Sequence, residues 1–387
     1  MSPAGHSKRS ATRPPAEVAV ASVGVALLVC ALVADQRWLD RHFLPSFFLS
    51  RNSYVLVESA VRLGTAGFGL LLALIARWVG RFIVKNPGRA LHIAMAAVLA
   101  VGASEFVLRQ IHLLATMEEP PQKEPRRRRD PRLGWIFVPS RTGYRNIGGR
   151  DVEYAIDSSG YRVRRVDDPV DPERPTILFT GESMMVGEGL TWDETVPAQV
   201  SAILGVQSAD LAVSGFSSDQ AYLRLQADLP RFRRPVAVVS LLMPAIFDRN
   251  LDDDRPHLGP GLVWLPPEPR WRLARIAQFL LPYRSQDTIE RGIAVTREVL
   301  RATVDLARAR GAVPLIIVLQ FAPEELVEHE LRRRILDEAG LPYVRVELDS
   351  GWRIPGNRHP DPRATRAMAV AIADELRGRL VFAGSVK

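Results

Sequence analysis

The sequence predicts an α/β protein with a doubly wound parallel sheet of about five strands, flanked by helices and preceded by transmembrane helices. Apolar residues are concentrated before Met117, whereas Asp, Glu and Pro become frequent only after it. From Thr176 onwards, short apolar runs alternate with stretches of helical periodicity, which is typical of sheets covered by helices on both faces. We therefore expect a membrane anchor (1–116), a charged linker (117–130) and an α/β domain (131–387).

The N-terminal third contains three apolar stretches, at 18–34, 55–79 and 91–114. A helix needs roughly 20 apolar residues to cross about 30 Å of hydrocarbon. The first stretch is the shortest, so a signal peptide is an alternative for it. About three transmembrane helices are expected.

The second and third apolar stretches each contain a pair of opposite charges. Glu58 and Arg62, and likewise Glu105 and Arg109, are spaced i,i+4, so each pair can meet on one helix face. Charges inside a span are costly, and partly interfacial helices are the alternative for these two stretches.

Basic residues near the ends of the spans predict the orientation of the chain. They precede the first stretch and lie between the second and third: Lys8, Arg9, Arg13, Arg77, Arg81, Lys85 and Arg89. By the positive-inside rule these segments face the cytoplasm, although Arg37, Arg41 and Arg51 occupy the opposite loop. We expect the inner (cytoplasmic) membrane, with the C-terminal domain extracytoplasmic or periplasmic.

The net charge of +8 is spread along the chain except for one dense run, Arg126 to Arg129. This run reads as a solvated linker or as a contact for anionic lipid headgroups. No reading motif for nucleic acid is present. The single cysteine, Cys30, excludes an intramolecular disulfide, and the dispersed histidines indicate no metal site. We expect no cofactor.

The soluble part begins after the linker EEPPQKEPRRRRD with a short β-rich leader at 131–175. Buried strands are then expected at 176–180, 236–242, 313–319 and 343–348, with helices at 194–204, 287–310 and 363–380. In such a flavodoxin-like sheet, ligands bind at the carboxyl ends of the strands.

Three of these strand ends carry residues suited to nucleophilic catalysis: Ser183, Gly215 (after Ser214) and His359. A histidine can remove the proton of a serine hydroxyl, and free backbone N–H groups at a turn can stabilise an oxyanion. Each residue also has a simpler reading. Ser183 can be a helix N-cap, Gly215 a turn glycine, and His359 a solvated residue in a helix-start signal.

Taken together, these blocks resemble the SGNH hydrolase family, also called GDSL-like esterases, in its membrane-anchored form. FTGESMMVGEG (179–189), LAVSGFSSDQ (211–220) and HPDP (359–362) are similar to the first, second and last family blocks, and 130–135 and 157–162 to its leader. The resemblance implies that Ser183 is the nucleophile, that His359 is the general base, and that the N–H groups of Ser183 and Gly215 hold the oxyanion.

The sequence departs from the family pattern at three places. Glu182 stands where the family usually has Asp. The acid that orients the histidine is replaced by Asn357, unless Asp349 substitutes for it. The Asn that completes the oxyanion hole is missing after the third strand, and Asn250 can fill that role only if its loop turns back.

These observations favour a membrane-anchored serine esterase or O-acyltransferase. Its expected partners are the lipid bilayer and an ester substrate, such as O-acetyl groups of a cell-envelope polysaccharide, with lipid esters open and no nucleic acid. One alternative is a catalytically weak relative that binds glycans or partner proteins. Another is a domain without this chemistry, which predicts that Ser183 and His359 lie far apart.

Overall fold

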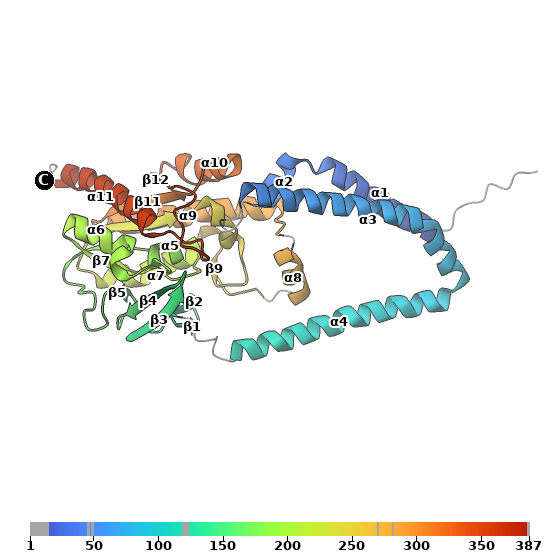
Figure 1. Ribbon diagram of the computed structural model, residues 1–387, viewed down its shortest axis with the longest axis horizontal. Coiled ribbons are helices and arrows are strands. Elements are labelled where there is room, and N and C mark those ends of the chain that lie inside the picture. The colour runs from blue at the N-terminus through green and yellow to red at the C-terminus, as the bar shows by residue number, and fades with distance from the viewer. Residues whose placement is uncertain are drawn as a thin grey trace, which may run out of the picture. The chain divides into compact units, whose positions relative to one another are not determined.

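A computed structural model describes residues 15–44, 47, 50–117, 124–268, 271–280 and 282–384. The chain divides into two compact units (Figure 1). The helical unit comprises 1–43, 49–117 and 271–282, and the α/β unit comprises 44–48, 118–270 and 283–387.

The helical unit contains the three predicted apolar stretches. Its helices are α1 (Pro15–Val33), α2 (Gln36–His42), α3 (Arg51–Lys85), α4 (Pro87–Met117) and α8 (Arg272–Leu280). Three of them have segments long and apolar enough to cross a membrane: Pro15–Val33, Arg51–Lys85 and Pro87–Ile111. The expected stretches at 55–79 and 91–114 lie inside α3 and α4, and the stretch at 18–34 ends one residue beyond α1.

Helices α1 and α3 approach closely where both carry glycine. A Cβ atom added to Gly24 would lie 2.6 Å from the Gly69 carbonyl oxygen, and one added to Gly69 would lie 2.7 Å from the Gly24 oxygen. Small residues at a helix contact allow backbones to approach in this way.

The two charge pairs behave differently. Arg109 Nε donates to Glu105 at 2.7 Å, as the spacing predicts. In contrast, Arg62 Nε donates to the Ala31 carbonyl at 2.6 Å. Glu58 accepts a hydrogen bond from Gln36 of α2, so each of these two charges has a partner on another helix.

The α/β unit is built on an eight-stranded sheet in the order β12-β11-β8-β6-β7-β5-β4-β3. Its five parallel strands are β6 (Pro175–Phe179), β7 (Gln207–Asp210), β8 (Arg234–Leu242), β11 (Val313–Gln320) and β12 (Tyr343–Glu347). In chain order these strands run 2-1-3-4-5 across the sheet, so the flavodoxin-like order is confirmed. The direction of winding reverses at β6, the strand that precedes Ser183.

Helices cover both faces of the parallel strands. On one face, Ile177, Val239 and Ile317 share a core with α6 (Val196–Leu204) and α11 (Pro362–Gly384). Neighbouring strand residues face the opposite way, towards α7 (Ser218–Asp228) and α9 (Gln286–Ala309): Leu178, Val238, Ile316 and Val318. This alternation explains why the strands read as continuous apolar runs.

The β-rich leader extends the sheet with antiparallel strands β3 (Arg141–Ile147), β4 (Arg150–Ile156) and β5 (Arg162–Val163). Two small ladders stand apart from the sheet. They are formed by β1 (Arg127–Asp130) with β2 (Gly134–Phe137), and by β9 (His257–Leu258) with β10 (Trp264–Leu265). The remaining short helices are α5 (Ser183–Val186), α10 (Leu326–Arg332), η1 (Trp192–Glu194), η2 (Leu229–Arg231), η3 (Pro244–Leu251), η4 (Pro260–Leu262) and η5 (Arg333–Asp337).

The expected linker at 117–130 requires a correction at its C-terminal end. Residues 127–130 form β1, because they pair along their whole length with β2 and because the Arg127 guanidinium stacks over the Trp135 ring at 5.6 Å. Residues 118–123 lie outside the described part of the chain.

Segment 44–48 of the loop between α2 and α3 belongs to the α/β unit, and Leu44 and Phe47 are its described residues. Phe47 is 5% exposed, and its N–H donates to the Ala245 carbonyl at 2.9 Å. Its ring lies 5.5 Å from Phe321 and 6.4 Å from the ring of His359, edge-on to both. The Arg353 guanidinium stacks on the same ring at 4.2 Å.

Candidate active site

Ser183 is buried at the turn from β6 into α5. Gly181 has φ +152°, a conformation that residues with a Cβ rarely adopt, and it turns the chain at the end of the strand. The Glu182 carboxylate then accepts the Met184 N–H at 3.2 Å and caps the short helix. Ser183 is thus the first residue of α5. The N-cap role considered for Ser183 belongs to Glu182, one position earlier.

Ser183 and His359 are hydrogen-bonded although 176 residues separate them in sequence. His359 Nε2 lies 3.0 Å from Ser183 Oγ, and Nδ1 lies 2.5 Å from Asn357 Oδ1. An amide oxygen only accepts, so Nδ1 carries the proton in this arrangement and Nε2 is left to accept from the serine. The structure therefore brings Ser183, His359 and Asn357 into one chain of hydrogen bonds.

The loop 353–360 positions the histidine. Ile354 N–H donates to the His359 carbonyl at 2.7 Å, and an isolated antiparallel bridge joins Arg353 to Pro360. Just beyond, the Asp361 carboxylate accepts the Ala364 N–H at 3.0 Å and caps α11. The His-Pro-Asp sequence therefore starts helix α11 and also places His359 beside Ser183, the two roles expected from the sequence.

Glu182 competes with His359 for the serine proton. Its Oε2 atom lies 2.6 Å from Ser183 Oγ and also accepts a hydrogen bond from Arg249 Nη1 at 2.9 Å. The serine hydroxyl has one proton, which can be directed to only one of the two acceptors at a time. Arg249 balances the charge of Glu182 and so weakens its attraction for that proton.

The Ser214–Gly215 turn follows β7 and reaches the same edge of the sheet. Residues 211–213 continue the pairing beyond β7, because Leu211 N–H donates to the Phe179 carbonyl at 2.8 Å. Gly215 has φ +86°. Among the described residues, neither the Ser183 nor the Gly215 backbone N–H has a hydrogen-bond acceptor, so both donors are available.

Asn250 is occupied by structural hydrogen bonds. Its Oδ1 accepts the Ser218 N–H at 2.9 Å, and its Nδ2 lies 3.1 Å from both Ser218 Oγ and Thr296 Oγ1. Both amide protons are therefore directed away from an oxyanion role. Asp349 accepts the Gly351 N–H at 2.7 Å within its own turn.

Glu188 is a further residue of the site that the sequence analysis did not single out. Its Oε2 atom lies 3.9 Å from His359 Nε2, and its Oε1 atom accepts a hydrogen bond from Arg145 at 2.9 Å. Desolvation opposes ionisation, but His359 in its imidazolium form and Arg145 outweigh it, and the pKa of Glu188 is lowered. The only hint in the sequence was its place in Gly-Glu-Gly, directly after the serine block.

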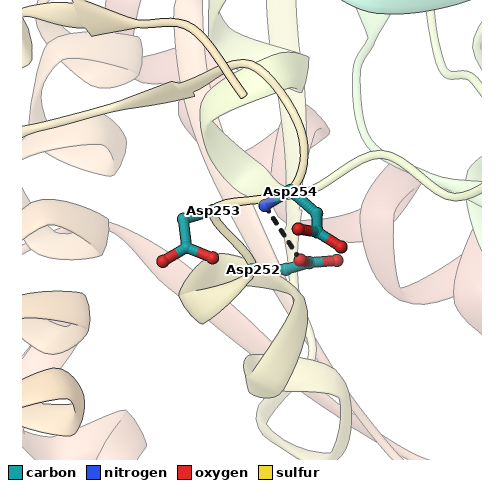
Figure 2. Close-up of side chains that lie close together, drawn as sticks. All are labelled: Asp252, Asp253 and Asp254. Atoms are coloured by element: carbon teal, nitrogen blue, oxygen red, sulfur yellow. Dashed lines mark hydrogen bonds between the residues drawn. The ribbon is translucent and has the colours of Figure 1, made fainter. Parts of the chain in front are cut away.

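An acidic group, Asp252, Asp253 and Asp254, lies outside this site (Figure 2). Asp252 accepts the Asp254 N–H at 3.2 Å and forms an ion pair with Arg255 at 2.8 Å. Local hydrogen bonds and charge pairing account for the position of Asp252.

No family model matches the sequence, and no curated protein is significantly similar to it. Among solved structures it is similar to the acetyl xylan esterase Est2A from the rumen bacterium Butyrivibrio proteoclasticus, with 13% identity and a TM-score of 0.35 over 55% of this chain and 66% of that one. A putative GDSL-family lipolytic protein from Desulfitobacterium hafniense is 12% identical, with a TM-score of 0.34 over 51% of this chain and 98% of that one. A putative arylesterase from Agrobacterium tumefaciens is 15% identical, with a TM-score of 0.33 over 53% of this chain and 99% of that one.

Proposed function

We propose that this protein is a serine esterase or O-acyltransferase of the SGNH type, held at a membrane by its apolar helices. The observation that carries the proposal is the 3.0 Å contact between Ser183 Oγ and His359 Nε2 at the carboxyl edge of a doubly wound sheet. The resemblance of the three sequence blocks around Ser183, Gly215 and His359 supports it.

In this reaction Ser183 Oγ attacks the carbonyl carbon of the ester while His359 Nε2 takes the hydroxyl proton. The electron pair of the C=O bond moves onto the carbonyl oxygen, where the N–H groups of Ser183 and Gly215 stabilise its charge. The bond to the alcohol then breaks, and His359 returns the proton to the departing oxygen. Water accepts the acyl group in hydrolysis, and a sugar hydroxyl accepts it in transfer.

The proposed substrate is an ester exposed at the cell envelope, such as an O-acetyl group of a polysaccharide. The basic residues before the first span and at the adjoining ends of α3 and α4 support an orientation with these segments in the cytoplasm and the α/β unit outside. The proposed location is the cytoplasmic membrane.

A second candidate is a catalytically weak protein that binds acylated glycans. Asn357 favours it, because an amide orients the histidine without stabilising the imidazolium as a carboxylate does. The engagement of Asn250 by Ser218 and Thr296 favours it too, since one side-chain oxyanion donor is then missing.

The test is hydrolysis of p-nitrophenyl acetate by the full-length chain in detergent. Ser183→Ala and His359→Ala should each abolish the activity, whereas Ser350→Ala and His329→Ala, at exposed positions, should retain it. Activity that persists without Ser183 contradicts the serine mechanism. A folded protein that is inactive but binds acetylated oligosaccharides supports the second candidate.

A further inference from the structure

We propose that Glu188 is a positioning residue that supplies the negative charge absent from Asn357, and that it acts on His359 from the Nε2 side. This inference rests on the proposed function, because it concerns the proton transfer from Ser183. It assigns a role to a half-buried carboxylate that the hydrogen-bonded chain of Ser183, His359 and Asn357 does not use.

The first step of the argument is the charge requirement of the mechanism. When His359 takes the serine proton it becomes an imidazolium, and a nearby anion stabilises that form. Asn357 Oδ1 contributes only a neutral acceptor at Nδ1. Glu188 Oε2 lies 3.9 Å from Nε2, within ion-pair distance of the ring.

The second step is that Glu188 is ionised and fixed. Its pKa is lowered despite the cost of desolvation, because His359 in its imidazolium form and Arg145 outweigh that cost. Arg145 Nη1 holds Oε1 at 2.9 Å, which leaves Oε2 directed towards the histidine. The side chain is 15% exposed, so solvent screens its charge only in part.

The third step is the construction of the loop that carries it. Arg162, fully buried, donates to the carbonyls of Val186, Gly187 and Leu190 on both sides of Glu188. Tyr154 Oη accepts the Gly189 N–H at 2.8 Å. Arg145, Tyr154 and Arg162 all come from the antiparallel leader strands β3, β4 and β5. The leader therefore holds the Glu188 loop in a fixed position next to the parallel sheet.

Other charged groups lie around Glu188 and reduce the field of its carboxylate at His359. Arg145 is paired with it directly, and Arg127 interacts with it at longer range. The phenol of Tyr154 is neutral at physiological pH, since burial raises its pKa. On the far side of the serine, Glu182 is balanced by Arg249. Glu188 is thus positioned to act on His359 Nε2.

The test compares Glu188→Gln and Glu188→Asp in the full-length chain, with and without Asn357→Asp. Removing the charge should lower kcat/KM roughly tenfold or more and move the acid limb of its pH profile to lower pH, because the imidazolium loses its anion. The loss should be much smaller in the Asn357→Asp background, where a carboxylate again serves the ring. Glu188→Asp should recover part of the activity, and the exposed Glu173→Gln is the matched control.

An equal loss in both backgrounds, or a loss without movement of the acid limb, overturns the inference and leaves Glu188 a purely structural role. If the parent protein shows no Ser183-dependent activity, the proposed function fails instead. NMR titration of His359, assigned by comparison with His359→Gln, then tests the inference by itself. The ring should titrate at lower pH in Glu188→Gln, and an unchanged titration contradicts the proposal.

Discussion

Arg249 Nη1 lies 2.9 Å from Glu182 Oε2, the same carboxylate oxygen that lies 2.6 Å from Ser183 Oγ. The side chain of Glu182 is 6% exposed and that of Arg249 is 21% exposed. This ion pair therefore neutralises a buried carboxylate in direct contact with the proposed nucleophile.

Replacing Arg249 by Gln should destabilise the protein by about 2–4 kcal/mol, because it leaves Glu182 charged, buried and unpaired. The matched control is Arg233→Gln, whose partner Glu173 is exposed and whose loss should change stability by less than about 1 kcal/mol. Thermal unfolding in detergent measures both. Equal shifts in the two variants would contradict the burial argument.

Asn250→Ala should reduce stability by about 1–2 kcal/mol, since Ser218 and Thr296 lose their hydrogen-bond partner. Its effect on kcat should be small. Loss of a true oxyanion donor typically lowers kcat by roughly a hundred- to thousandfold. Such a drop in ester hydrolysis, in a variant with unchanged thermal stability, would show that Asn250 moves into the site with substrate.

Arg162→Lys should be destabilising by about 2–4 kcal/mol although it keeps the charge. One ammonium cannot reproduce a buried guanidinium that donates to carbonyls spread over Val186, Gly187 and Leu190. Arg164→Lys, at an exposed position paired with Asp193, should have little effect. A comparison of their melting temperatures checks this.

Asp210 should make stability depend on pH. Burial raises its pKa to about 7, although its Oδ1 atom accepts the Ala212 N–H. Between the unfolded value of about 3.9 and about 7, the folded state holds a proton that the unfolded state has released, so stability falls as pH rises through this window. In Asp210→Asn this loss should disappear, giving a gain over the parent protein of up to about 4 kcal/mol above pH 7. Urea unfolding at pH 4.5 and pH 8 tests it, and a difference independent of pH would refute it.

Gly69→Ala should weaken the packing of α1 on α3, because the new methyl group would lie 2.7 Å from the Gly24 carbonyl oxygen. Gly67→Ala is the control on the same helix, since nothing described lies within 4 Å of a Cβ there. We expect a loss of about 1–3 kcal/mol only in the first variant. Heat-induced loss of helical signal in detergent distinguishes the two.

The sequence was most informative where burial dictates the residue pattern. The apolar runs expected at 236–242 and 313–319 are the interior strands β8 and β11. The parallel pairing of β6, β8, β11 and β12 then brings Ser183 and His359 to the carboxyl edge of the sheet. The proximity of Glu188 to His359 could not be predicted from the apolar pattern, because it depends on a tight turn that side chains of the leader strands hold in place. The composition of 127–130 predicted a linker, but these residues form β1 because their backbone pairs with β2.

The position of Phe47 constrains the membrane crossings proposed for the apolar helices. This residue packs beside His359 in the α/β unit, and α3 and α4 are the two long apolar helices between it and β1. A chain segment that crosses a membrane twice ends on the side where it began, whereas a segment that crosses once ends on the opposite side. The contact therefore requires an even number of crossings between residues 47 and 124, and α3 with α4 as a transmembrane hairpin satisfies this parity.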